Sequence, residues 1–196
     1  MSAMRHMNKI PLLLTVLRAL LAPVIVFLAL AYPSKPLFGA CLIVAFVSDV
    51  FDGIIARRLN IATAGLRRLD SIADSIFYAA ASLAAWLLYP EVIREHSVAL
   101  TILVIVELMR YVFDVAKFER EASYHMWSSK VWGLFLFIGF FDLLVFGQTG
   151  LMVAVPIYLG IVADLEGLAI SFVLTEWRAD VPSIFHALRY RTDQRT

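Results

Sequence analysis

Four aspartates, arranged as two close pairs, are the residues of this sequence whose spacing best suits them to chemistry. Asp49 and Asp52 are three residues apart, and Asp70 and Asp74 are four residues apart. On an α-helix, both spacings place the two side chains of a pair on one face. Two adjacent helices can therefore direct four carboxylates at a single point.

Carboxylates gathered in this way repel one another unless cations lie between them. Hard divalent cations prefer oxygen ligands, and Mg²⁺ suits carboxylates combined with substrate phosphates. Two such ions about 4 Å apart can hold both the attacking and the leaving oxygen at a phosphorus atom. Beside the first pair, Gly53 lets a ligand approach the backbone, Ala56 is small, and Arg57 offers a planar fork for phosphate oxygens. A lone aspartate here would more often be a solvated helix end, but the combination favours a metal-assisted site for phosphate chemistry.

The composition places this site in a membrane. The chain has 196 residues and a formal net charge of +1, with 61% hydrophobic and 17% charged residues. Ordinary soluble domains contain about 25% charged residues. So apolar a chain is not disordered, and the lack of a basic excess argues against a soluble nucleic-acid-binding protein. The single cysteine, Cys41, excludes an internal disulfide and a cysteine-based metal site.

The hydropathy pattern predicts the elements that carry the site. A membrane-spanning helix needs about 20 mostly apolar residues, and six stretches meet this need: 10–31, 37–56, 70–89, 97–116, 131–148 and 151–174. The tail segment 181–191 is amphipathic and basic, which predicts a short helix along the inner leaflet. We therefore expect an all-α, polytopic membrane protein with six transmembrane helices and a short amphipathic C-terminal helix, forming a single transmembrane domain over residues 1–196.

The distribution of Lys and Arg predicts how these spans are oriented, because cytoplasmic loops are enriched in both. The N-terminus, residues 57–68, residues 117–130 and the tail from Glu176 carry 2, 4, 3 and 4 of them, which is 13 of the 17. The opposite loops carry only Lys35 and Arg94. Both termini and all four aspartates are therefore expected on the cytoplasmic side of the membrane.

The aspartates belong to a longer pattern, D-x2-D-G-x2-A-R-x8-G-x3-D-x3-D, which resembles the signature of the CDP-alcohol phosphatidyltransferases. The matching residues are Asp49, Asp52, Gly53, Ala56, Arg57, Asp70 and Asp74. The second glycine of the pattern falls at Leu66, and a glycine occurs one position earlier, at Gly65. The segment 11–18 is similar to the P-N-x-L-T-x-x-R opening of phosphatidylglycerophosphate synthases, with Leu12 in place of Asn.

This resemblance implies a fold of six helices, a reaction and a set of site residues. Two Mg²⁺ or Mn²⁺ ions would be held by Asp49, Asp52 and Asp70, with Asp74 in or near the ligand shell. The CDP part of CDP-diacylglycerol would contact Gly53, Ala56, Arg57, Thr63 and Gly65. Asp74 would take the proton of an acceptor hydroxyl, the acceptor oxygen would attack the lipid-side phosphorus, and CMP would leave. Members of the family are commonly homodimers.

Three basic residues each have two interpretations. Arg18, inside the first span, either steadies the diphosphate or snorkels to the lipid headgroups. Arg110, in the fourth span with Glu107 and Asp114 on its face, either holds a phosphate of the acceptor or pairs with Glu107. Lys130 resembles the basic start of the fifth helix in synthases with a phosphorylated acceptor, and it is otherwise a positive-inside anchor. No role is assigned to Asp142, Asp164 or Glu166.

The predicted function is phosphatidyl transfer in phospholipid biosynthesis, with glycerol 3-phosphate as the first choice of acceptor. Inositol phosphate, serine or another alcohol is the alternative within the same reaction. A divalent-cation transporter is an alternative from another class, but its carboxylates belong near the middle of the bilayer, often in repeated halves. An inactive relative with a structural role is a third alternative, and the intact set of four aspartates argues against it.

Overall fold

The computed structural model describes residues 10–59 and 63–193, and every element within them is helical. The prediction of an all-α protein is therefore confirmed. The chain divides into two compact units. The first holds the described residues up to Ile93 together with Phe140–Gln148, and the second holds Arg94–Gly139 and the described residues from Thr149 on. A single domain over residues 1–196 stays a prediction.

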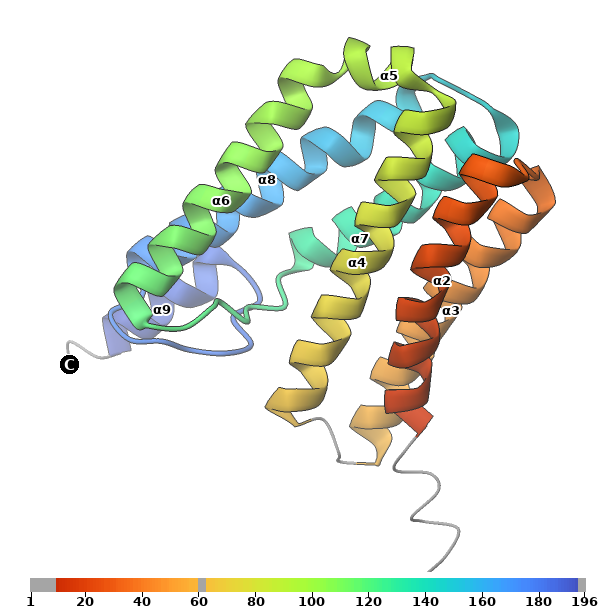
Figure 1. The fold of residues 1–196 in the computed structure, drawn as a ribbon. Helices are drawn as coiled ribbons and strands as arrows, with labels where there is room; N and C mark the ends of the chain where they lie inside the picture. Colours follow the sequence, from red (N-terminus) through yellow and green to blue (C-terminus); the bar gives the residue numbers. More distant parts are fainter. Residues whose placement is uncertain (1–9, 60–62, 194–196) are drawn as a thin grey trace, which may run out of the picture. The chain divides into compact units, whose positions relative to one another are not determined.

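Three long helices build the first unit: α2 (Ile10–Ala31), α3 (Lys35–Arg58) and α4 (Ala64–Leu88), shown from red to yellow-green in Figure 1. Helix α2 packs against both α3 and α4. Ala81 and Ala84 of α4 are fully buried, and side chains this small let neighbouring helices approach closely. An inward-facing side chain of α2 can therefore reach both of the other helices.

One short helix, and a change of helix type inside a predicted span, were not predicted. Helix α5 (Pro90–Glu95) begins with a proline, which suits the first helical position because its fixed φ is already helical. The π-helix η1 (Asp142–Phe146) follows α7 (Trp127–Phe141), lies within the predicted fifth span and contacts α3. It ends at Gly147, whose φ of 72° lies in the left-handed region that glycine adopts without strain.

The second unit is built on α6 (Ser97–Phe118) and α8 (Leu151–Val173), which pack against each other. It also contains most of α7 (Trp127–Phe141) and α9 (Ile184–Asp193), and α9 packs on α8. A core cluster joins these parts, made of Tyr124, Met126, Ile170, Leu174, Val181 and Ala187. The predicted C-terminal amphipathic helix is thus present as α9, and its place along the inner leaflet stays a prediction.

Five helices are long and apolar enough to cross a membrane, namely the segments Ile10–Ala31, Lys35–Ala56, Arg68–Leu88, Trp127–Phe146 and Leu151–Val173. Large apolar side chains are exposed along them, as at Leu30 with 67% and Phe172 with 60% of the side chain accessible. Apolar surface on this scale marks contact with lipid or with another protein. The chain is an integral, multi-pass membrane protein.

The sixth predicted span, residues 97–116, forms helix α6 but is not among those five segments. Charged side chains set it apart, because Glu107, Arg110 and Asp114 all lie within it. Helices with charged residues inside a span usually turn them toward protein rather than lipid. The helix was therefore predicted correctly, and its crossing of the membrane stays a prediction.

The third predicted span, 70–89, agrees closely with the candidate span Arg68–Leu88, but the helix that contains it begins earlier, at Ala64, because a capping interaction starts it there. Thr63 is the N-cap of α4, and its hydroxyl oxygen accepts a hydrogen bond from the backbone N–H of Leu66 at 3.2 Å. Such a cap satisfies one of the free N–H groups of the first turn. Asp70 and Asp74 consequently lie in the second and third turns of α4 and not at its start.

Substitution of Gly139 by alanine is expected to destabilise the second unit. A Cβ atom at Gly139 would lie 2.7 Å from the backbone oxygen of Met152 and 2.9 Å from Cγ of Pro156. Overpacking of this kind typically costs about 1–3 kcal/mol. Thermal unfolding in detergent measures the loss. The matched control is Gly133→Ala in the same helix, where a Cβ meets nothing within 4 Å, and an equal effect of both variants would contradict the packing argument.

Candidate active site

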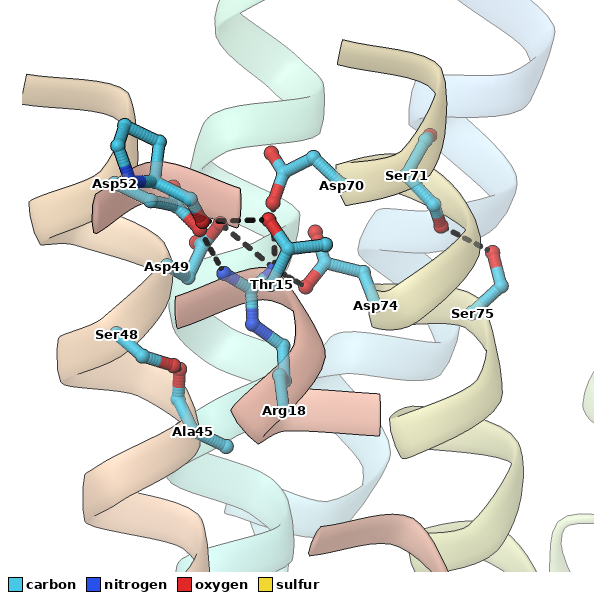
Figure 2. A network of polar contacts seen from close by, with 11 residues as sticks. Thr15, Arg18, Ala45, Ser48, Asp49, Asp52, Asp70, Ser71, Asp74 and Ser75 are labelled. Carbon is cyan, nitrogen blue, oxygen red and sulfur yellow. Dashed lines mark hydrogen bonds and ion pairs between the residues drawn. The ribbon is translucent and has the colours of Figure 1, made fainter. Parts of the chain in front are cut away.

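The four aspartates converge within the first unit, around one arginine (Figure 2). Helix α3 supplies Asp49 and Asp52, helix α4 supplies Asp70 and Asp74, and helix α2 supplies Arg18. The contact of α2 with both other helices brings the three segments together. The spacings of three and four residues thus place both pairs on facing helix surfaces, as the sequence indicates.

Arg18 contacts all four carboxylates. Its Nη2 donates to Oδ2 of Asp52 at 2.6 Å, and its Nη1 donates to Oδ1 of Asp70 at 3.0 Å. Nη1 also donates to Oδ1 of Asp74 and lies 3.3 Å from Oδ1 of Asp49. The Arg18 side chain is 1% exposed. It points into the carboxylate cluster and does not snorkel toward the headgroups.

The four carboxylates differ in their exposure. The Asp52 side chain is 4% exposed, whereas those of Asp49, Asp70 and Asp74 are 44%, 30% and 33% exposed. One oxygen from each of the three exposed carboxylates lies within 4.8 Å of the other two. Three hard oxygen ligands this close fit a divalent cation such as Mg²⁺. We call Asp49, Asp70 and Asp74 the carboxylate triad.

The triad differs from the ligand set that the resemblance implies. That set names Asp49, Asp52 and Asp70 as the principal ligands, whereas the structure groups Asp74 with Asp49 and Asp70. Asp52 is instead buried and held by Nη2 of Arg18. The difference arises because Asp74 lies one helical turn beyond Asp70 on the same face of α4.

Two buried hydroxyl groups near the cluster are satisfied within their own helices (Figure 2). The hydroxyl of Thr15 donates to the carbonyl of Pro11 at 3.0 Å, and that of Ser48 donates to the carbonyl of Ala45 at 2.8 Å. Ser and Thr side chains commonly bond to the preceding turn in this way. Neither hydroxyl competes for the carboxylates, so Arg18 is the donor that the described residues direct at them.

The residues predicted to contact the nucleotide lie beyond the cluster, at the end of α3 and the start of α4. Gly53 is half-buried, Ala56 is buried, and Thr63 is the exposed N-cap of α4. A Cβ atom at Gly65 would meet nothing within 4 Å, so this glycine borders open space. The side chain of Arg57 lies outside the described part of the structure.

The two predicted acceptor residues lie in the second unit and have partners there. Nε of Arg110 is 3.4 Å from Oδ1 of Asp164, whose side chain is only 2% exposed. Neither interpretation of Arg110 from the sequence foresaw this ion pair. Nζ of Lys130 lies 4.5 Å from the ring centre of Trp127, within cation–π range.

Glu166 and Asp142, which received no role from the sequence, both make contacts that stabilise local structure. Glu166 accepts a hydrogen bond from the backbone N–H of Ile184 at 3.2 Å, at the start of α9. Asp142 begins η1, where its backbone carbonyl, and not its carboxylate, accepts a hydrogen bond from the backbone N–H of Gln148 at 3.1 Å. Their partners are backbone N–H groups, and these contacts cannot be predicted from the spacing of residue types in the sequence.

A buried polar network in the second unit was also missed. The hydroxyl of Ser171 donates to Asp114, pairs with the hydroxyl of Tyr124 at 2.8 Å and lies 3.1 Å from the carbonyl of Gly167. Asp114, Ser171 and Tyr124 are all at most 4% exposed. The position of Asp114 in an apolar stretch was the signal that could have predicted this network, since a charged residue in such a stretch usually faces a polar partner in the protein.

Comparison with protein families places this geometry in context. The sequence model of the CDP-alcohol phosphatidyltransferases matches residues 8–177, which is most of the chain. The chain therefore belongs to the CDP-alcohol phosphatidyltransferase family. No match was found among curated proteins or among solved structures.

Membership of this family defines the class of reaction. The protein is a transferase of substituted phosphate groups, which moves a phosphatidyl group from a CDP-alcohol to an alcohol. The family generally uses a divalent metal, and the carboxylate triad offers suitable oxygen ligands. The transporter alternative has no comparable support, and the intact set of four aspartates argues against an inactive relative.

Proposed function

We propose that the protein transfers the phosphatidyl group of CDP-diacylglycerol to glycerol 3-phosphate and releases CMP. The observation that carries this proposal is the carboxylate triad, whose oxygens lie within 4.8 Å of one another. Its position in the matched sequence pattern supports a role at the diphosphate of the donor. The similarity of the segment 11–18 to phosphatidylglycerophosphate synthases supports the choice of acceptor.

In this proposal the carboxylates have two roles. Asp49, Asp70 and Asp74 would hold two Mg²⁺ or Mn²⁺ ions, and the buried Asp52 would add a fourth negative charge beside them. When bound there, such ions would supply positive charge to the donor diphosphate and to the charge that develops at phosphorus. Gly53, Ala56, Arg57, Thr63 and Gly65 bind the CDP part, and Arg18 steadies the diphosphate.

Asp74 is proposed as the general base. It takes the proton of the acceptor hydroxyl, and the acceptor oxygen forms a bond to the lipid-side phosphorus. The bond from this phosphorus to the bridging oxygen of the diphosphate breaks, and CMP leaves with the electron pair. With 33% of its side chain exposed, Asp74 is accessible to a hydroxyl group, as a general base must be.

We also propose that the site and both termini face the cytoplasm and that two copies form a homodimer. The excess of Lys and Arg in the loops on that side supports the orientation. A cytoplasmic site serves both substrates, because the donor lipid lies in the membrane whereas CMP and a polar acceptor are water-soluble.

Chelation is expected to abolish CMP release, and added Mg²⁺ or Mn²⁺ is expected to restore it, because the triad needs cations to bind a diphosphate. The assay uses the purified full chain with CDP-diacylglycerol and a panel of acceptors: glycerol 3-phosphate, inositol phosphate, serine and glycerol. Glycerol 3-phosphate should give the fastest CMP release. Sustained turnover in excess chelator would overturn the metal-dependent mechanism, and a faster rate with another acceptor would overturn only the acceptor.

Lys130→Ala is expected to raise the KM for glycerol 3-phosphate by about 10–100-fold, since a hydrogen bond to a charged group contributes about 1.5–3 kcal/mol. The kcat and the KM for CDP-diacylglycerol should stay unchanged, which is the signature of lost ground-state binding. Arg110→Ala should act in the same way when made together with Asp164→Asn, which prevents an unpaired buried charge. Lys35→Ala is the control, and unchanged acceptor kinetics in the Lys130 and Arg110 variants would remove both residues from the acceptor site.

A further inference from the structure

One nitrogen of Arg18 lies where the three carboxylates of the triad meet. Nη1 contacts Asp49, Asp70 and Asp74, the same three residues whose oxygens are close enough to share a cation. Nη2 contacts Asp52 alone. The guanidinium is therefore divided between two tasks, with one nitrogen on the triad and the other on the buried carboxylate.

Nη1 cannot satisfy the whole triad. An arginine Nη carries two hydrogens, and here they point to Asp70 and Asp74. Oδ1 of Asp49, at 3.3 Å from Nη1, is in ion-pair range but accepts no hydrogen bond from it. Four carboxylates around a single positive charge leave the cluster strongly anionic, so the triad retains its attraction for further cations.

The guanidinium also has one hydrogen-bond donor that the described residues do not satisfy. Nε of Arg18 is buried and has no hydrogen-bond partner among the described residues. A buried, unsatisfied donor costs free energy, so the observed arrangement does not use all that this side chain can bind. An acceptor oxygen brought in from outside the protein would remove this cost.

We propose that Arg18 is a positioning residue whose guanidinium exchanges its hydrogen bonds with the triad for hydrogen bonds with the substrate. Nη2 keeps its bond to Asp52, while Nη1 gives up Asp70 and Asp74 when a divalent cation takes their oxygens. The hydrogens of Nη1 then turn to a phosphate oxygen of the nucleotide. Before the substrate binds, Arg18 thereby competes with the cation for the carboxylates of the triad. Afterwards, Arg18 and the cation both bind the phosphates of the nucleotide. This inference rests on the proposed function.

The bond between Arg18 and Asp52 limits this exchange to a movement within the Arg18 side chain. At 2.6 Å between nearly inaccessible side chains, it is a charge-assisted hydrogen bond that does not involve the triad. It holds the guanidinium beside the cluster when Nη1 is released. A movement of one end of the guanidinium is therefore enough, and no helix has to shift.

The test compares Mn²⁺ binding and CDP binding in wild type and Arg18→Gln, using the full chain in detergent. Arg18→Gln should bind Mn²⁺ about tenfold more tightly, because a competing positive charge has been removed. In saturating Mn²⁺ it should bind CDP about tenfold more weakly, because a charged donor to phosphate has been lost. A merely structural arginine would not give tighter metal binding together with weaker nucleotide binding.

The matched control is Arg58→Gln. Arg58 is the exposed last residue of α3, the helix that also carries Asp49, and it has no ion pair with the triad among the described residues. Arg58→Gln should change Mn²⁺ affinity much less than Arg18→Gln does. If Arg18→Gln binds Mn²⁺ no more tightly than wild type, the exchange is wrong, even when CMP release depends on metal. If wild type neither binds Mn²⁺ nor needs it for CMP release, the proposed function fails as well.

A second measurement on the unmodified sequence covers the case in which Arg18→Gln does not fold. With ¹⁵N-labelled arginine, the side-chain resonances of Arg18 are assigned by their loss in Arg18→Lys. They should move when Mg²⁺ is added and move again when CDP follows. Resonances that stay in place at Mg²⁺ concentrations sufficient for CMP release would overturn the exchange.

Discussion

Asp74→Asn is expected to reduce CMP release by about 10²–10⁴-fold, the usual contribution of general-base catalysis. Asparagine keeps the size of the side chain and one oxygen for a metal or for Nη1 of Arg18, but it cannot accept a proton near neutral pH. Metal binding should weaken no more than it does in Asp49→Asn or Asp70→Asn, and in saturating Mn²⁺ nucleotide binding should stay nearly normal while turnover collapses. Single-turnover CMP release and Mn²⁺-dependent CDP binding measure the two effects separately.

The other members of the triad are the matched controls. Asp49→Asn and Asp70→Asn should weaken metal binding, and high Mg²⁺ should partly restore their activity by mass action. All three variants remove one charge from the same cluster, so a difference between them reports the role of each carboxylate. If high Mg²⁺ restores Asp74→Asn as well as Asp49→Asn, Asp74 is only a ligand and another group is the base.

Arg110→Ala is expected to lower the free energy of unfolding by about 3 kcal/mol, the lower end of the usual cost of removing one partner of a buried ion pair. Asp164 is 2% exposed, and its Oδ2 has no hydrogen-bond partner among the described residues. Without Arg110 its charge would be left without this compensation. Gly167 makes the arrangement feasible, because a Cβ there would lie 2.9 Å from Cδ of Arg110.

Thermal unfolding in detergent checks this prediction, and a second substitution makes it specific. Arg110→Ala combined with Asp164→Asn should recover most of the lost stability, because the unpaired charge is removed. Arg189→Ala on the exposed side of α9 should change stability by no more than about 0.5 kcal/mol, as is usual for surface sites. A double variant as unstable as the single one would show that the ion pair is not the cause.

Properties that depend on short stretches of chain could be predicted from the sequence. Apolar runs of about 20 residues predict spanning helices, and five of the six expected spans meet the requirements for crossing a membrane. The spacing of Asp49, Asp52, Asp70 and Asp74 predicts carboxylates on shared helix faces, and the longer pattern around them identifies the family. These features need only the helical repeat and the local hydropathy.

The start of α4 is a local feature that hydropathy alone misplaced. The apolar pattern suggests a start at residue 70, whereas the helix begins at Ala64. Its first turn is polar, so hydropathy does not mark it, but the hydroxyl of Thr63 can cap it. A search for capping residues before the apolar run would have found this start and placed both aspartates deeper in the helix.

Only the tertiary structure decided which groups the charged side chains meet. Arg18 was expected at the diphosphate or at the headgroups, and it lies among four carboxylates from two other helices. Arg110 was expected to bind phosphate or Glu107, and it pairs with Asp164 on another helix. The spacing along a chain determines which side chains share a helix face, but partners on different helices depend on the relative rotation and depth of those helices. Packing of the whole bundle determines both, and no short stretch of sequence encodes them.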